Sequence, residues 1–192
     1  MMVGGTVLFD VRWEGAHGIG RFARELRSRL PVEPFSPERD RLGALEPLRL
    51  GQDLRRRSPR FFFSPGFAAI VGYDGPFAVT VHDLIHLETV ERSIAKRFYY
   101  DRLLAPTLRR ASFVCTVSEF SKARILDWLD MDPDRVRVVG NGVSDGCRPD
   151  GESFDWRRRY VLYVGNDKPH KNLEVLFQAS KRTVSRRHGT CC

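Results

Sequence analysis

A histidine and an aspartate, His82 and Asp83, directly follow the apolar run Phe77–Val81. This run is β-branched and aromatic, which predicts a strand covered on both faces of a parallel sheet. Ligands of open parallel sheets bind at the carboxyl ends of the strands, so the pair lies where a cleft is expected. A neutral imidazole can donate or accept a hydrogen bond there near pH 7. The alternative is a histidine whose hydrogen bonds only stabilise the structure.

A second candidate site is the polar loop between the apolar run Tyr160–Val164 and a helix predicted to begin after Asn172. The loop contains an amide, an imidazole and two ammonium groups, from Asn166, Lys168, His170 and Lys171. A helix N-terminus attracts phosphate through its unpaired N–H groups and its positive dipole end, and Lys171 would strengthen this attraction. An ordinary strand–loop–helix connection with solvated lysines explains the same spacing.

A third candidate is the segment Gly18–Ala23, which matches the dinucleotide-binding pattern G-x-G-x-x-A. Two observations argue against a nicotinamide or flavin site. Residues 12–17 separate Gly18 from the predicted strand Thr6–Val11, and no strand that ends in an acidic residue follows about 20 residues later. The helix N-terminus would still accept a diphosphate or a sugar. Glycines that only permit an unusual loop are the alternative.

The elements that position these residues alternate between strand and helix. Strands are predicted at residues 6–11, 61–64, 77–81, 113–117, 136–139 and 160–164. Helices are predicted at 21–30, at 94–110 with an interruption at Pro106, and after the cap Ser118. The long helix is expected to pack through Phe98, Tyr99, Arg102, Leu103 and Leu108. The proline-rich segment 31–59 is predicted to be variable surface with short helical pieces. The alternation predicts an α/β fold with a Rossmann-like parallel sheet.

Composition restricts the class of protein and of partner. A hydrophobic fraction of 42% over 192 residues supplies a real core, and no apolar run reaches the roughly 20 residues of a membrane span. The four cysteines are expected to be reduced thiols in a cytoplasmic protein. The net charge of +8 favours an anionic partner. Nucleic acid is not expected, because zinc-finger spacing and an RNA-binding signature are absent. Peripheral contact with an anionic membrane leaflet fits the charge about as well.

Six short segments follow one another in an order that is more specific than any one of them. They are GIGRFARELRSRL, FFFSPGF, VTVHDLIHLE, RRASFVCTVSEFSKARI, DRVRVVGNGVSDGCRP and YVLYVGNDKPHKNLEVLFQA. Together they resemble glycosyltransferase family four, the retaining nucleotide-sugar enzymes of the GT-B fold. The resemblance implies two Rossmann-like domains that face a cleft, with the acceptor bound mainly by the first domain and the donor mainly by the second.

The resemblance also implies roles for single residues of the first domain. Four of them would border the donor diphosphate and the acceptor: Gly18, Ile19, Gly20 and Arg21. His82 would lie beside the transferred sugar and hydrogen-bond one of its hydroxyl groups, and Asp83 would orient the turn. No metal or cofactor is implied. The donor substrate would be a nucleotide-diphospho-sugar such as GDP-mannose or a UDP-sugar, and the acceptor a glycan or a lipid-linked molecule in polysaccharide biosynthesis.

In the second domain, Lys171 matches the lysine that neutralises the donor diphosphate. Many members have arginine where this chain has Asn166, so Lys168 or His170 would share the cationic role. The expected boundaries are 1–150 for the first domain, 151–159 for a linker and 160–192 for the start of the second. The family's pair of nucleotide-binding glutamates would lie beyond this segment, and the tail 181–192 lacks an apolar repeat. A truncated, mannosyltransferase-like chain that is inactive alone is therefore expected.

Two other functions fit parts of the pattern. One is a non-catalytic module that binds a nucleotide or a glycan. The other is a dinucleotide oxidoreductase, which would depend on the segment GIGRFA alone.

Overall fold

The computed structural model describes residues 6–37, 43–88, 94–143, 148, 150–151, 161–165, 167 and 171–185. The chain separates into two units, Met1–Ser144 (unit 1) and Asp145–Cys192 (unit 2). The domain boundaries at residues 150 and 160 stay a prediction.

Unit 1 is organised around a parallel sheet, which among the described residues has six strands in the order β2-β1-β3-β4-β5-β6. The strands are β1 (Val7–Asp10), β2 (Glu33–Phe35), β3 (Phe61–Ser64), β4 (Phe77–Thr80), β5 (Phe113–Thr116) and β6 (Val136–Val138). The chain leaves β1 toward β2 and returns to β3 on the other side, which is the doubly wound arrangement. The prediction of an α/β, Rossmann-like fold is confirmed.

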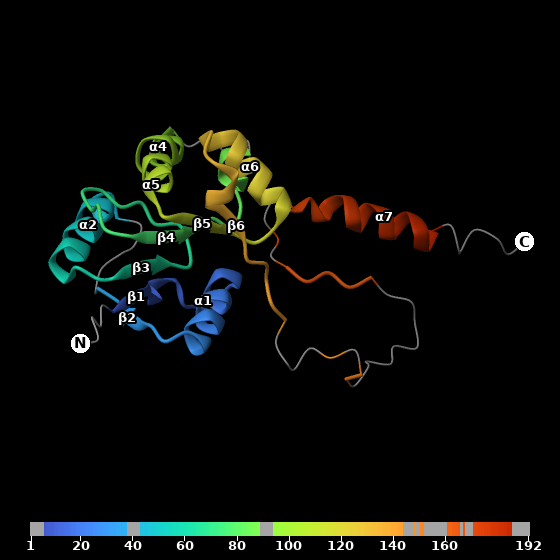
Figure 1. Cartoon of the computed structure of the whole chain (residues 1–192). Coiled ribbons are helices and arrows are strands. Elements are labelled where there is room, and N and C mark those ends of the chain that lie inside the picture. Colours follow the sequence, from blue (N-terminus) through green and yellow to red (C-terminus); the bar gives the residue numbers. More distant parts are fainter. Residues whose placement is uncertain are drawn as a thin grey trace, which may run out of the picture. The chain divides into compact units, whose positions relative to one another are not determined.

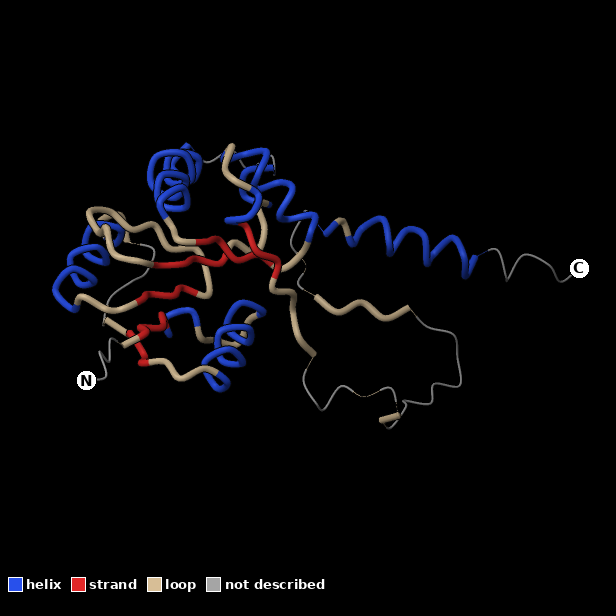
Figure 2. Tube along the Cα trace, in the orientation of Figure 1, coloured by secondary structure: helices blue, strands red, loops and turns tan. Residues whose placement is uncertain are grey.

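Helices cover both faces of this sheet (Figures 1 and 2). They are α1 (Gly18–Arg29), α2 (Glu46–Arg57), α3 (Ile85–Glu88), α4 (Ile94–Tyr99), α5 (Ala105–Arg110) and α6 (Glu119–Leu129), with short helical turns at Val11–Trp13, Tyr100–Leu104 and Pro133–Arg135. Helix α1 lies on the opposite face from α4, α5 and α6 (Figure 1). None of the described helices combines the length and the hydropathy that crossing a bilayer requires.

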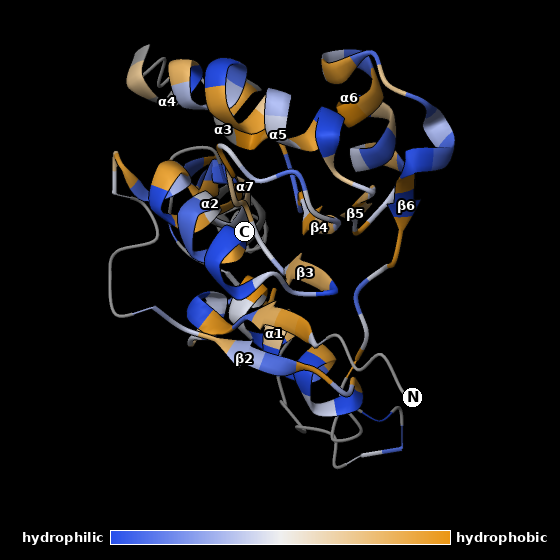
Figure 3. Ribbon diagram, turned by 60° about the vertical axis from the view of Figure 1, so that its left-hand side comes forward, coloured by the Kyte–Doolittle hydropathy of each residue, from blue (hydrophilic) through white to orange (hydrophobic). Residues whose placement is uncertain are grey.

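Among the described residues, two apolar clusters fill the space between sheet and helices, because alternate residues of a strand point to opposite faces. The larger cluster contains Phe62, Val79 and Val114, with α2, α5 and α6 residues above them. The smaller one joins Phe9 to Ala23 of α1. The central strand β3 is hydrophobic, whereas the edge strand β2 is largely hydrophilic (Figure 3).

Helix α1 begins at Gly18, three residues before the predicted start at Arg21. His17 is the reason, because its Nδ1 accepts a hydrogen bond of 3.0 Å from the N–H of Gly20. Histidine is an unusual cap and glycine is a poor helix former, so residue preferences alone predicted a helix start that is too far along the chain. The glycine segment is therefore the first turn of the helix and not a loop.

The segment 31–59 is more regular than predicted. It contains strand β2 and the helix α2, which has 12 residues. Pro47 lies in the first turn of α2, where its missing N–H is not needed, and Pro34 lies on an edge strand. The prolines therefore mark the ends and edges of elements and do not interrupt them.

The packing face predicted for the helical region before β5 is confirmed only in part. Leu108 is buried and Tyr99 packs against the larger cluster, but Phe98 is 59% exposed and Arg102 is exposed. The turn Tyr100–Leu104 is π-helical, and its wider turn changes which side chains face the sheet. Five side chains form the buried face: Tyr100, Leu104, Ala105, Thr107 and Leu108. Pro106 lies in the first turn of α5, as the predicted interruption requires.

In unit 2 the predicted helix is present and the predicted strand is not. Helix α7 spans Leu173–Ser185. Residues 161–164 form no strand, and Val164 is 85% exposed. A strand needs hydrogen bonds from a neighbouring strand, and no such neighbour occurs among the described residues of unit 2. The prediction of a buried parallel strand there is wrong for this chain.

Candidate functional site

A cleft of about 620 Å³ lies at the carboxyl ends of β4, β5 and β6, beside the start of α1. It is entirely within unit 1. Five predicted site residues line it: Gly18, Ile19, Arg21, His82 and Asp83. Residues that are about 60 positions apart in the sequence are thus brought together, because α1 and the end of β4 meet at the same edge of the sheet.

The two glycines of the predicted motif have different surroundings. Gly18 lines the cleft, and a Cβ added to it would meet no atom within 4 Å. Gly20 is buried outside the lining, and its Cβ would overlap the backbone of Gly15. Gly18 therefore leaves room on the cleft side, whereas Gly20 allows the loop before α1 to pack against the helix.

Alanine substitutions should separate these two roles. We expect Gly20→Ala to lower the free energy of unfolding by about 1–3 kcal/mol, because the loop must move away. Gly18→Ala should leave it unchanged or raise it by about 0.4–1 kcal/mol, since alanine fits a helical position without strain. Urea unfolding of both variants measures the difference. Equal destabilisation by both would contradict the assignment.

His82 is half-buried and is held on three sides. Its Nε2 lies 2.9 Å from the carbonyl oxygen of Pro65. Its own carbonyl accepts a hydrogen bond of 3.1 Å from the hydroxyl of Ser121, in the first turn of α6. The ring of Phe22 meets the imidazole edge to face, with centroids 5.0 Å apart. The side chain is therefore fixed at the wall of the cleft.

Burial lowers the pKa of His82 below its ordinary value of 6.5, against the opposing effects of the Pro65 carbonyl and of Asp83. The imidazole is consequently neutral at pH 7. A neutral imidazole offers one donor and one acceptor nitrogen. The carboxylate of Asp83 accepts a hydrogen bond of 3.1 Å from the N–H of Ile85, which fixes the turn after His82.

Several residues of the cleft lining are not among the predicted site residues. Examples are Asn141 and Gly142, which follow β6, and Glu25 of α1. A polar side chain at the carboxyl end of a predicted strand was the available signal for Asn141, and it is the signal that singled out His82.

Comparison with known proteins identifies the family. The model of Glycosyltransferase Family 4 matches residues 11–146, which include the whole lining of the cleft. The chain belongs to Glycosyltransferase Family 4. It is also similar to the O-antigen chain mannosyltransferase RfbU of Salmonella typhimurium, with 28% identity over 103 residues. That match covers 54% of this chain but only 28% of RfbU.

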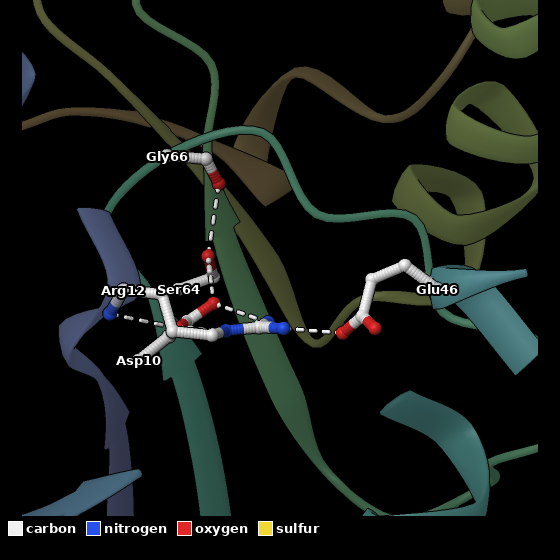
Figure 4. Close-up of polar contacts among 5 residues, drawn as sticks. All are labelled: Asp10, Arg12, Glu46, Ser64 and Gly66. Atoms are coloured by element: carbon white, nitrogen blue, oxygen red, sulfur yellow. Dashed lines mark hydrogen bonds and ion pairs between the residues drawn. The ribbon is translucent and has the colours of Figure 1, made fainter. Parts of the chain in front are cut away.

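This family member also contains a buried charged network, whose residues lie outside the cleft lining (Figure 4). Arg12 donates to both carboxylate oxygens of Asp10, at 2.7 and 2.9 Å, and also to Glu46 of α2. The Ser64 hydroxyl has one proton, which it shares between two acceptors, Asp10 Oδ2 at 3.3 Å and the Gly66 carbonyl oxygen at 3.0 Å. Burial opposes the charge on Arg12, but the two carboxylates more than offset it and raise the pKa of Arg12.

The predicted donor residues of unit 2 are mostly outside the described part of the chain. Asn166, Lys168 and His170 lie there, and their predicted roles stay predictions. Lys171 is exposed and stands two residues before α7. Its predicted contact with the donor diphosphate also stays a prediction.

The described residues contain no group of three or more histidine, cysteine, aspartate or glutamate side chains that could hold a metal ion. Cys115 is a buried free thiol, and burial raises its pKa to about 11, so the reactive thiolate is scarce at pH 7.

Proposed function

We propose that this chain supplies the acceptor side of a retaining glycosyltransferase of the GT-B type. It would act on a nucleotide-diphospho-sugar and a glycan or lipid-linked acceptor. The observation that carries the proposal is the cleft at the carboxyl ends of the strands, where Gly18, Arg21 and His82 meet. That edge of a doubly wound sheet is the usual ligand site, and the family match supports glycosyl transfer as its chemistry.

The start of α1 is suited to the phosphate groups of a donor. The N–H of Gly20 bonds His17 Nδ1, and that of Arg21 bonds the His17 carbonyl. In the described part of the chain, the N–H groups of Gly18 and Ile19 have no such bond, so they can donate to phosphate oxygens. The Arg21 guanidinium adds a positive charge at the same place.

His82 is suited to the sugar. Its neutral imidazole lies at the cleft wall and can hydrogen-bond a hydroxyl group of the sugar during transfer. The matched relative is named a mannosyltransferase, which makes GDP-mannose the first donor to test and UDP-sugars the second. Lys171, with Lys168 and His170, would neutralise the diphosphate from the donor-binding part of the protein.

Ligand titrations followed by amide NMR test this proposal on the chain itself. GDP, UDP, GDP-mannose and methyl α-mannoside are the probes. We expect shift changes at Gly18, Ile19, Arg21 and His82, at dissociation constants of about 1 mM or below. Arg21→Ala should weaken the phosphate-containing ligands about tenfold, as for one lost hydrogen bond to a charged group. The dissociation constant of methyl α-mannoside, which has no phosphate group, should change less than twofold, which corresponds to about 0.4 kcal/mol or less.

Arg27→Ala is the matched control, because Arg27 is also on α1 but pairs with Glu14 outside the cleft lining. It should leave every affinity unchanged. An equal loss in both variants would mean that only net charge matters. Shift changes confined to other surfaces would overturn the proposed site.

A further inference from the structure

We propose that the buried network Asp10–Arg12–Glu46–Ser64 positions the Pro65 carbonyl so that His82 carries its proton on Nε2 and uses Nδ1 only as a hydrogen-bond acceptor. A hydroxyl group of the sugar then donates its hydrogen bond to Nδ1 of His82. The four network residues act as positioning residues, because they reach the site through Pro65 and Gly66. This role deepens the proposed function and rests on it for the identity of the ligand.

The tautomer follows from the contact between His82 and Pro65. A carbonyl oxygen has no proton and can only accept, so the nitrogen 2.9 Å away must be the donor. In the neutral imidazole the proton is consequently on Nε2, and Nδ1 keeps its lone pair. Because the pKa of His82 is lowered by burial, this neutral form dominates at pH 7.

The Pro65 carbonyl is fixed by the residues on both sides of it. The hydroxyl of Ser64 bonds the carbonyl of Gly66 at 3.0 Å, which closes a tight turn around Pro65. The ring of Trp13 covers Gly66 so closely that a Cβ there would overlap it. Ser64, Pro65 and Gly66 are all buried, so water cannot replace these contacts.

The charged part of the network holds Ser64 in turn (Figure 4). Asp10 Oδ2 lies 3.3 Å from the Ser64 hydroxyl, and the forked guanidinium of Arg12 fixes both oxygens of Asp10. Glu46 bonds the remaining side of Arg12 from helix α2. Planar, two-point pairing of this kind fixes direction as well as distance. A series of contacts thus links α2 to the imidazole through β1 and β3.

Nitrogen-15 NMR of the imidazole reads the tautomer directly in the whole chain, without substrate. The signals of His82 are assigned with His82→Gln. In the wild type we expect Nε2 to be the protonated nitrogen and Nδ1 the unprotonated one. Ser64→Ala and Asp10→Asn should each shift the ratio of tautomers about fivefold or more toward Nδ1–H, as expected when one hydrogen bond is weakened.

Thr107→Val is the matched control. Thr107 is also buried and bonds backbone groups, with 2.9 Å between its hydroxyl and the N–H of Ile70, but it has no link to Pro65. It should reduce stability and leave the tautomer ratio of His82 unchanged. A wild-type proton on Nδ1 would overturn the inference. So would an unchanged ratio in both network variants, or an equal shift in Thr107→Val.

A sugar series tests the acceptor role separately. Methyl α-mannosides that carry hydrogen or fluorine in place of one hydroxyl group are titrated into the chain. At the position that faces His82, both replacements should weaken binding alike, because neither can donate to Nδ1. If fluorine preserves affinity where hydrogen loses it, the hydroxyl is an acceptor and the inference is wrong. If the tautomer is as predicted but no replacement matters, the proposed sugar contact fails instead.

Discussion

Arg12→Ala is expected to lower the free energy of unfolding by about 3–5 kcal/mol, which is the usual cost of breaking a buried ion pair. The side chains of Arg12, Asp10 and Glu46 are 6%, 0% and 5% exposed. Removal of the guanidinium would leave two carboxylates in the interior without their shared partner. Water reaches neither of them easily, so little of the lost interaction is recovered.

Chemical unfolding in urea measures this effect, with circular dichroism as the signal. Arg29→Ala is the matched control, because Arg29 also pairs with a glutamate, Glu25, but both side chains are about half exposed, at 62% and 46%. Exposed pairs contribute about 0–1 kcal/mol. If Arg12→Ala lowered the free energy of unfolding by less than about 1.5 kcal/mol, the network would contribute no more to stability than an exposed ion pair does.

A second variant separates the charge of Arg12 from its size. Arg12→Lys keeps the positive charge but cannot form the two-point contact with Asp10. We expect about half of the destabilisation to remain in this variant, and the tautomer ratio of His82 to stay shifted. Full recovery of both properties would show that charge alone is sufficient.

The sheet could be predicted from the sequence because its central strands are buried on both faces. All four residues of β4, Phe77–Thr80, are buried, and such strands appear in a sequence as uninterrupted apolar runs. Because His82 directly follows this strand, the general rule for parallel sheets then placed it at the cleft. The capping preference of serine gave Ser118 as a helix cap, and its hydroxyl does accept from the N–H of Ser121 at 3.1 Å.

Other features depend on contacts between distant residues and could not be predicted locally. The apolar run before Gly165 has high strand propensity, yet it forms no strand without a neighbour to bond. Arg12 and Glu46 are 34 positions apart in the sequence. Their pairing requires helix α2, which lies in the proline-rich segment 31–59 that was predicted to be irregular. The residues next to Arg12 in the sequence do not indicate that its partner is Glu46.

His82→Ala is expected to reduce sugar transfer by about 10- to 1,000-fold in an active form of the protein, the range for loss of one positioned polar group. Nucleotide affinity should stay within about threefold, because the groups proposed to bind phosphate do not include His82. His82→Gln tests whether hydrogen bonding alone is sufficient. Lys171→Ala should give the opposite result, with weaker nucleotide binding as its main effect.

The pH dependence gives an independent measure of the same residue. The pKa of His82 lies below 6.5, mainly because of burial, although Asp83 opposes this effect. Transfer that requires an unprotonated Nδ1 should therefore be constant near pH 7 and decline only as the pH falls below 6.5. Phe22→Ala admits water to the imidazole and should move this decline to higher pH, since less burial raises the pKa.

Steady-state transfer from pH 5 to 8, together with calorimetric titration of the nucleotide, covers both expectations. If His82 contacts the sugar, His82→Ala loses turnover and also loses the acid limb of the profile, because the titrating group is gone. If His82 only stabilises the cleft, His82→Ala loses nucleotide affinity and turnover together, and the decline of its remaining activity at low pH is kept. The second pattern would show that His82 does not contact the reacting sugar and that it only stabilises the cleft wall through its contacts with Pro65 and Ser121.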